Sequence, residues 1–278
     1  MKANLPTNEQ SHPIIALWAH PRSMSTATER IMRERGDIAC LHEPFMYFHY
    51  IAAGNTPFAW FDAEEGQPHE FVDIIAMLEA SARNQPVFFK DMAYYVVPRL
   101  FEYEGFAGRL VHVFIIRDPR KAILSYYKLD QNIKCEEVGH AAQWQLFEWL
   151  ANRANDEQKQ PPLIIEAEKM QQAPRDTMGR VWQYIGLPPA DHAFDWSNKG
   201  LPEDWRAVAG WHQSALASTR IRPEVRQSET ELARAFEDVA KEAPKLQDYL
   251  DYHWSCYERL RAVSRKQVNL FAKAKESE

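Results

Sequence analysis

Short apolar runs alternate along the chain with longer segments whose apolar residues recur every three or four positions. The runs are rich in Ile, Val, Leu and Phe and too short for helices, so they predict buried strands at 14–18, 86–90, 110–116 and 163–165. The periodic segments that follow three of these runs predict helices at 25–35, 119–127 and 176–185. Gly36 is expected to end the first of these helices.

This alternation predicts an α/β fold in which helices flank a parallel central sheet. From about residue 229 the pattern is helical to the end of the chain, apart from a break near Pro244. Because there is no internal repeat and no clear domain boundary, we expect a single domain over 1–278. The polar residues 1–12 and the charged residues 273–278 are expected to be flexible.

Composition and charge narrow the class of protein. The 278 residues carry a net charge of −6, which argues against a general nucleic-acid binder. No apolar run approaches the ~20 residues of a membrane helix, and the first residues lack the apolar core of a signal peptide. We therefore expect a cytoplasmic enzyme with neither a membrane nor a nucleic-acid partner. The sequence leaves the oligomeric state open.

The spacing of histidine and cysteine predicts neither a metal site nor a disulfide framework. Cys40, Cys135 and Cys256 are far apart and form no CxxC pair. The ten histidines include no HExxH motif. We therefore expect no metal cofactor.

Two junctions between a strand and the next helix carry residues that suit an anion. The first places the cation Arg22 beside a helix start rich in hydroxyl groups, at Ser23, Ser25 and Thr26. Backbone N–H groups and the helix dipole make such a start an anion site. A plain helix cap with Glu29 as its acid explains the same residues equally well. A GxxxxGK[ST] loop is absent, which argues against a nucleoside triphosphatase.

The second junction follows the strand at 110–116. A capped helix start explains Asp118 and Pro119, but not the cations crowded beside them, Arg117, Arg120 and Lys121. Positive charge is unfavourable at a helix N-terminus, and an anionic ligand would offset it. Ser125 follows on the same helix, within reach of that anion. Ligands bind beyond the carboxyl ends of parallel strands, so the two junctions predict one ligand with two separated phosphate-like groups.

Both junctions resemble motifs of the sulfotransferase family. His20-Pro21-Arg22-Ser23-Met24-Ser25-Thr26 resembles the 5′-phosphosulfate loop, which has the form P-[RK]-[ST]-G-[ST]-[ST] between a strand and a helix. The segment 114–120 with Ser125 is similar to the 3′-phosphate motif, in which an Arg and a Ser eight residues later hold the phosphate. Weaker likenesses follow in order, 163–170 to a strand ending in a Y-E-D-L-like turn and 182–188 to an F-L-G-L-P helix end. The resemblance spans about residues 14–190 and is to a bacterial-type branch that acts on small molecules or carbohydrates.

Three departures from the family pattern concern the cofactor contacts. Met24 stands where the loop usually has glycine. The pair at 166–167 is Glu-Ala where the family usually has Arg-Tyr. The R-K-G loop that covers the 3′-phosphate in many cytosolic members has no clean counterpart. Its candidate is the segment 205–212, continuing to Arg220 and Arg222.

The resemblance implies a P-loop-like, nucleotide-binding architecture with a helical C-terminal region. It also implies 3′-phosphoadenosine 5′-phosphosulfate (PAPS) as donor, no metal, and sulfuryl transfer to a hydroxyl or amine of a small-molecule or sugar acceptor. Arg22 would act catalytically by stabilising the transferring group. The residues implied in cofactor binding are Arg22, Ser23, Met24, Ser25, Thr26, Ala27, Arg117 and Ser125.

The acceptor needs a general base, which contributes about 10²–10⁴-fold to a rate. Glu43 is the first choice, because several sulfotransferase branches resemble this chain in carrying a catalytic Glu at the corresponding turn. Asp91, after the second strand, and the neighbouring His42 are the alternatives. An ordinary surface-loop carboxylate before Pro44 explains Glu43 equally well.

Aromatic residues gather after this turn. They fit a wall over the acceptor pocket or, slightly better, a helical insertion into the core, and comprise Phe45, Tyr47, Phe48, Tyr50, Phe58, Trp60 and Phe61. Trp182 or Phe194 could stack on adenine, although packing in the core is the commoner fate of a tryptophan.

Two other function classes stay open. A nucleotide-dependent phosphotransferase of the kinase type would depend on magnesium, and the missing GK[ST] argues against it. A non-catalytic nucleotide-binding protein would bind the cofactor without turnover, and Met24 with the atypical basic loop favours that alternative.

Overall fold

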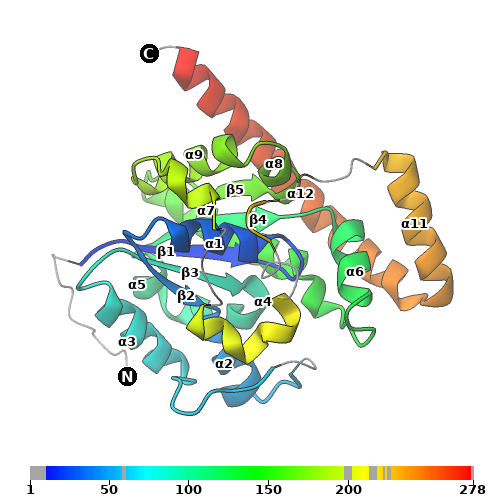
Figure 1. Cartoon of the computed structure of the whole chain (residues 1–278), viewed down its shortest axis with the longest axis horizontal. Helices are drawn as coiled ribbons and strands as arrows, with labels where there is room; N and C mark the ends of the chain where they lie inside the picture. The colour runs from blue at the N-terminus through cyan, green and yellow to red at the C-terminus, as the bar shows by residue number, and fades with distance from the viewer. Residues whose placement is uncertain are drawn as a thin grey trace.

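A computed structural model describes residues 11–57, 61–196, 202–212, 218–221, 223 and 227–276. At its centre lies a five-stranded parallel sheet with the order β2-β3-β1-β4-β5 (Figure 1). The strands are β1 (Ile14–Ala19), β2 (Ala39–His42), β3 (Val87–Met92), β4 (Leu110–Ile116) and β5 (Leu163–Glu166). The predicted parallel α/β fold is confirmed.

Helices connect the strands and extend the chain beyond the sheet. The longer ones are α1 (Ser25–Glu34), α3 (Phe71–Ser81), α6 (Pro119–Tyr127), α7 (His140–Asp156), α9 (Pro174–Ile185), α11 (Glu229–Glu242) and α12 (Lys245–Glu276). The shorter ones are α2 (Pro44–Tyr47), α4 (Ala93–Val96), α5 (Glu104–Ala107) and α8 (Ala167–Gln172). A π-helical turn, η1 (Phe48–Ala52), follows α2, and the 3-10 segments are η2 (Arg99–Glu102), η3 (Glu136–Val138), η4 (Asp191–Phe194) and η5 (Glu203–His212).

The helices form layers on both faces of the sheet (Figure 1). The connection from β1 to β2 runs toward one edge, whereas the connection from β4 to β5 runs toward the other. Right-handed crossovers therefore place α1 and α7 on opposite faces. The long helix α12 packs along α7 and β5. The sheet is thus buried on both sides, as its nearly continuous apolar strands predict.

Helix α7 ties the two central strands together at their carboxyl ends. The side-chain amide of Gln143 donates to the carbonyl oxygens of Trp18 (3.1 Å) and Ile115 (2.9 Å). These two residues are the next-to-last residues of β1 and β4, the strands that lead into the two predicted anion motifs. One buried side chain therefore fixes the spacing between the two motifs.

Several elements differ from the sequence prediction. Strand β2 was not predicted, because its half-buried edge position leaves little apolar signal. Helix α9 begins at Pro174, two residues before the predicted start at residue 176, with the proline in its first turn. Helix α12 extends into the charged tail as far as Glu276, and the flexibility expected of that tail stays a prediction. The helices at α3 and α7 were not assigned from the sequence either.

The aromatic segment after β2 is helical and largely internal. Phe45, Tyr47 and Tyr50 are buried in the core, and Phe48 packs against it. The described part therefore matches the helical insertion and not a wall. Phe58 and Trp60 lie outside the described residues.

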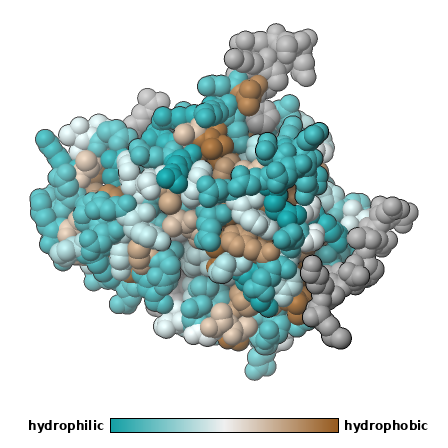
Figure 2. Space-filling model, turned by 180° about the vertical axis from the view of Figure 1, so that it is seen from behind, coloured by the Kyte–Doolittle hydropathy of each residue, from teal (hydrophilic) through white to brown (hydrophobic). Residues whose placement is uncertain are grey.

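The surface seen in Figure 2 is mostly hydrophilic, with apolar residues in scattered patches. The large apolar side chains exposed in the described part are Ile51, Val72, Leu129, Tyr252 and Leu270. Among the described residues, no helix has both the length and the apolar character needed to cross a membrane.

Candidate functional site

The loop after β1 turns into α1 through two left-handed residues, Arg22 (φ 64°) and Met24 (φ 69°). Met24 is the N-cap of α1 and provides no side-chain cap, and the first turn carries no acidic residue. The first amide bonded within the helix is that of Thr28, which donates to the Met24 carbonyl (3.2 Å). The plain-cap interpretation is therefore wrong. Amides at a helix start have no partner inside the helix and suit an anion.

Met24 occupies a backbone conformation that normally favours glycine. A left-handed conformation costs an L-residue about 1–2 kcal/mol, because its Cβ lies too close to the following carbonyl oxygen. The methionine side chain packs against the core, which offsets part of that cost. The loop thus keeps the glycine-like turn although it lacks the glycine.

Two hydrogen bonds join the two predicted motifs. Arg22 Nε donates to Ser125 Oγ over 3.0 Å, and Arg117 Nη1 donates to the Arg22 carbonyl over 2.9 Å. The sequence analysis predicted that these segments meet at one edge of the sheet, and the structure brings them together there. The roles of individual residues toward a ligand stay predictions.

The electrostatics of this junction favour an anion. Burial, and after it the charge of Arg117, lowers the pKa of Arg22. Ser23 Oγ and Arg117 Nε are buried, and neither has a hydrogen-bond partner among the described residues. Buried polar atoms normally have partners, and oxygens of a phosphate or sulfate would satisfy both. The residues present therefore fit an anionic ligand at this junction.

Arg120 was expected to have its positive charge offset by an anionic ligand, and this expectation is wrong. Its guanidinium is bonded to the N-cap residue Asp118 (2.5 Å) and to Glu229 (2.7 Å), and it lies 5.0 Å from the ring centre of Trp254. Asp118 accepts from the Arg120 amide as well, so this arginine belongs to the helix cap. Arg117, by contrast, contacts the first loop.

Glu43 lies at the carboxyl end of β2 and is only 4% exposed, so the surface-loop interpretation is wrong. It is left-handed (φ 42°), and the fully buried Lys90 donates to its Oε1. The hydroxyl of Tyr95 is 3.4 Å from Oε2. His42 Nε2 lies 3.7 Å from Oε1. A buried carboxylate is thus held beside a compensating ammonium group.

The two alternative bases are engaged in supporting contacts. Asp91 is fully buried and accepts from the Phe45 amide (2.9 Å), which holds α2 in place. Burial, and after it the charge of Glu43, raises the pKa of Asp91. Burial and the charge of Lys90 lower the pKa of His42, whose Nδ1 lies 2.7 Å from Glu29. Each of the two carboxylates keeps one weakly held oxygen: Asp91 Oδ1 is buried without a hydrogen-bond partner among the described residues, and Glu43 Oε2 has a 3.4 Å contact from Tyr95.

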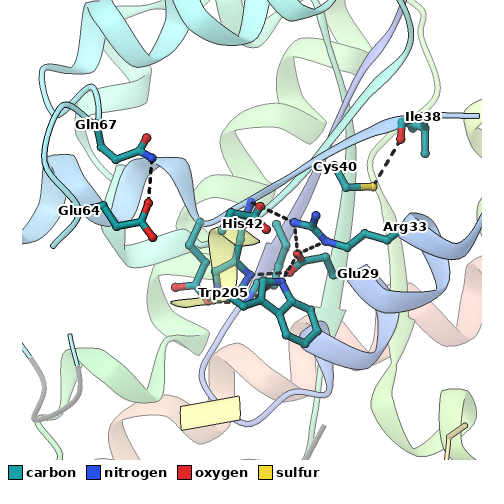
Figure 3. Close-up of polar contacts among 11 residues, drawn as sticks. Glu29, Arg33, Ile38, Cys40, His42, Glu64, Gln67 and Trp205 are labelled. Carbon is teal, nitrogen blue, oxygen red and sulfur yellow. Dashed lines mark hydrogen bonds and ion pairs between the residues drawn. The ribbon is translucent and has the colours of Figure 1, made fainter. Parts of the chain in front are cut away.

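Glu29 of α1 is the centre of a buried polar cluster. Figure 3 shows Arg33, His42 and Trp205 converging on its carboxylate, with the Trp205 indole nitrogen 2.7 Å away. Asp204 adds contacts to Arg33 (2.5 Å) and to the His42 amide (3.0 Å). The cluster fastens η5 to α1 and β2. Glu29 is therefore part of this cluster and not a first-turn acid.

The described residues of the candidate basic loop, Trp205 and Arg220, have contacts outside the two anion motifs. Trp205 is buried against Glu29, so it is not a cofactor contact. Arg220 lines a cavity of about 440 Å³ together with Arg175 and Phe194. Arg222 lies outside the described residues.

The weaker likenesses have structural positions of their own. Glu168, in the turn after β5, accepts from the Asp118 amide (3.2 Å) and so supports the second motif. Trp182 is 2% exposed and lies under the guanidinium of Arg35 (5.0 Å). It is therefore a core residue, and the adenine-stacking interpretation does not hold for it.

The sequence analysis missed three residues that shape this site. Lys90 is the buried partner of Glu43, and a lysine ending an apolar strand was the available signal. His20 and His140 contact the Arg117 backbone. His20 stands inside the quoted motif, whereas His140 is brought in by the fold and gave no sequence signal.

Metal ligands and disulfides play no visible part in the described portion. No three His, Cys, Asp or Glu residues within it are grouped to hold a metal ion. Cys40, Cys135 and Cys256 are free thiols.

Comparisons with known proteins show which family this chain resembles in sequence and in fold. A family model described as sulfotransferase domain matches residues 13–234. The sulfotransferase domain of the Synechococcus PCC 7002 olefin synthase is similar in fold, with a TM-score of 0.55 and 13% identity over 84% of this chain and 98% of that one. The sulfotransferase domain from the curacin biosynthetic pathway has a TM-score of 0.51 and 10% identity over 83% and 98%.

A curated relative, the branched-chain-amino-acid aminotransferase-like protein 2 of Arabidopsis thaliana, is 22% identical over 219 residues. The match covers 74% of this chain but only 36% of the plant protein, so this chain spans about a third of that relative. The family model and both similar structures are sulfotransferase domains, and the match to the family model covers most of the chain. The chain therefore belongs to the sulfotransferase family.

Proposed function

We propose that this chain is an enzyme that moves a sulfuryl group from PAPS to a hydroxyl or amine of a small-molecule or sugar acceptor. The observation that carries the proposal is the junction of the two anion motifs, where Arg22 contacts Ser125 and Arg117 contacts the Arg22 carbonyl. PAPS has two separated anionic groups, the 5′-phosphosulfate and the 3′-phosphate. A junction of two motifs, each with its own arginine, matches that charge pattern.

Each motif has a separate binding task in this proposal. The turn from Ser23 to Ala27 would hold the 5′-phosphosulfate at the start of α1, with the buried Ser23 hydroxyl as one donor. Arg117 and Ser125 would hold the 3′-phosphate. The Nε–H group of Arg117, which has no hydrogen-bond partner among the described residues, would be one of the donors. The left-handed Met24 shapes the turn that lets the first amides face one point.

PAPS supplies an activated sulfuryl group, so the protein needs mainly to position the reactants and stabilise charge. Arg22 is partly buried beside Arg117, and its guanidinium would bind the oxygens that gain negative charge. Loss of one preorganised donor of this kind costs on the order of 10²–10³ in rate. The arginines and amides would supply the neutralising charge at this junction.

Glu43 would orient the acceptor and take its proton at Oε2. The ammonium group of Lys90 holds Oε1, which leaves Oε2 for an incoming hydroxyl or amine. The Tyr95 hydroxyl lies beside this carboxylate, and the ring of the half-buried His49 lies 4.8 Å from the Tyr95 ring; both side chains would contact an acceptor. Proton transfer to a positioned carboxylate is the general-base step that the proposal requires.

The direct test is turnover of PAPS with a library of hydroxyl and amine acceptors, with and without a magnesium chelator. We expect formation of 3′-phosphoadenosine 5′-phosphate (PAP) that depends on the acceptor and is unaffected by the chelator. Binding of PAP without turnover on any acceptor would support the non-catalytic alternative. Turnover of ATP that is lost on chelation would support a phosphotransferase and contradict the proposal.

A further inference from the structure

Two buried imidazoles bracket the peptide backbone of Arg117. The amide of Arg117 donates to His20 Nε2 over 3.1 Å, and the Nε2–H group of His140 donates to the Arg117 carbonyl over 2.8 Å. His20 comes from the loop after β1, and His140 opens α7. The two rings are 4.1 Å apart between centroids, and both residues are fully buried.

The hydrogen bonds fix which nitrogen carries the proton in each ring. His20 Nε2 accepts, and its Nδ1–H donates to the Pro21 carbonyl over 3.0 Å. His140 Nε2 must carry a proton, because it faces a carbonyl oxygen. Protonating His20 at Nε2 would set two donors against each other, so the bracket requires a neutral His20 ring.

The surrounding groups keep these imidazoles neutral. His20 is faced by His140, Arg117 and His253, and burial together with these groups lowers its pKa well below the usual value. His140 is faced by His253, Asp118 and the edge-on ring of Tyr257, and its pKa is lowered to about 4, mainly by burial.

The packing is specific for this arrangement. Gly139 has φ +82°, and a Cβ on it would lie 2.6 Å from the Cβ of His20. Only glycine therefore lets α7 begin this close to the first loop. On the far side, His253 of α12 accepts from the Ala141 amide (3.0 Å) and donates to the Cys135 carbonyl (2.8 Å), which orients the turn that carries His140.

We propose that His20 and His140 are positioning residues that hold the Arg117 backbone, and through it the Arg117 guanidinium, in place for the 3′-phosphate of the nucleotide. This inference rests on the proposed function for its ligand. The guanidinium assigned to the 3′-phosphate is carried by this backbone, so a shift of the Arg117 peptide would move that group away from the phosphate. A merely structural histidine pair would affect every ligand of the site alike.

The test compares PAP with AMP, which lacks the 3′-phosphate, by calorimetric titration. We expect His140→Leu to bind PAP about tenfold more weakly, since a buried hydrogen bond is lost, and to bind AMP as the wild type does. His140→Gln places an amide donor near the position of Nε2 and should recover most of the PAP affinity. We expect His20→Leu to weaken PAP binding as well. His20→Gln should restore it, because the glutamine side-chain oxygen can accept the hydrogen bond from the Arg117 amide.

His112 provides the matched control. It is also a buried imidazole with two hydrogen bonds, to the Trp18 indole (2.8 Å) and the Ala107 carbonyl (2.9 Å), but it contacts neither motif. We expect His112→Gln to leave the ratio of PAP to AMP affinity unchanged. An unchanged ratio in both leucine variants, or an equal loss for PAP and AMP, would overturn the positioning role alone. Failure of the wild type to bind PAP would overturn the proposed function.

A second measurement does not depend on a variant that folds. Long-range ¹H–¹⁵N spectra of the imidazoles report which ring nitrogen is protonated. We expect His20 to be protonated only at Nδ1 and His140 only at Nε2, with no change between pH 7.5 and 5.5. The opposite tautomer, or titration of either ring in that range, would overturn the bracket whatever the ligand.

Discussion

Arg22 Nε donates to Ser125 Oγ over 3.0 Å, although 103 residues separate the two in the sequence. Arg22 follows the central strand β1, and Ser125 lies on α6, which follows the neighbouring strand β4. The strand order therefore converts two distant sequence motifs into one cationic junction. Every prediction about the ligand depends on this junction.

Removal of the Ser125 hydroxyl should weaken PAP binding. In Ser125→Ala, Arg22 loses the acceptor that orients its guanidinium, and the ligand loses one hydroxyl contact. We expect about a three- to tenfold higher Kd, which corresponds to one net hydrogen bond. Calorimetric titration measures this. Ser81→Ala is the control, because Ser81 is a helical serine bonded only to the Met77 carbonyl (3.0 Å) in α3; an equal loss in that variant would contradict a local role.

Met24 should accept glycine but not a β-branched residue. Its φ of 69° suits glycine, and a β-branched side chain is disfavoured in that region. We expect the free energy of unfolding of Met24→Gly to lie within about 1 kcal/mol of the wild-type value. Relief of backbone strain in the folded state offsets the larger conformational entropy that glycine gives the unfolded chain. Met24→Ile should be less stable by more than about 1 kcal/mol. Urea denaturation tests both, and a stable isoleucine variant would show that the loop does not hold this conformation.

Glu43→Gln should abolish turnover and preserve PAP affinity, because Glu43 follows β2 and is not part of the two anion motifs. The same change removes the nearer carboxylate of the buried Lys90 ammonium group and leaves it only the more distant Glu29, at 4.0 Å. Breaking one side of a buried ion pair costs about 3–5 kcal/mol, so this variant should also be less stable.

The double variant Glu43→Gln, Lys90→Met separates these two effects. With both charges removed, most of the stability should return. Turnover should still be absent, as measured by PAP formation from PAPS. Near-normal turnover in either variant would remove Glu43 from the mechanism.

Acid should destabilise the protein through its buried neutral histidines. Burial lowers the pKa of His112 and of His140 to about 4, whereas an unfolded imidazole titrates near 6.5. Between these values the unfolded state binds protons that the folded state does not, so the free energy of unfolding falls as the pH decreases. Each such histidine contributes up to about 1.4 kcal/mol per pH unit in that window.

Urea denaturation at pH 7.5, 6.0 and 5.0 measures this slope. His112→Gln should make it shallower by about one proton, because glutamine does not titrate. A free energy of unfolding that stays constant over this range would show that these imidazoles are not held neutral.

The sheet and the two motifs were predictable because their signals are local. Continuous apolar runs marked β1, β3, β4 and β5, and the residues at 119–127 formed the predicted helix. Strand β2 gave no such signal, because it is only half-buried, whereas β5 at the other edge of the sheet is buried and packs against α12. Both anion motifs were identified as well, because the residues that build each of them are close in sequence.

The contacts between distant segments were not predictable. Nothing in the sequence places Lys90 on Glu43 or His140 on Arg117, because each pair is brought together only by the fold. Arg120 was misassigned for the same reason, since its partner Glu229 is 109 residues away. Buried charge pairs, and side chains that bond to the backbone of a distant residue, depend on tertiary packing. They become visible only in the folded structure.

The most direct test of the central claim is calorimetric titration of wild type and Arg117→Ala with PAP, AMP and ATP plus magnesium. We expect micromolar binding of PAP to the wild type, much weaker binding of AMP, and a loss of about tenfold or more in PAP affinity in Arg117→Ala, because a charged hydrogen bond is removed. Preferred binding of ATP with magnesium, or PAP affinity that does not change in Arg117→Ala, would contradict the assignment of this junction to PAPS.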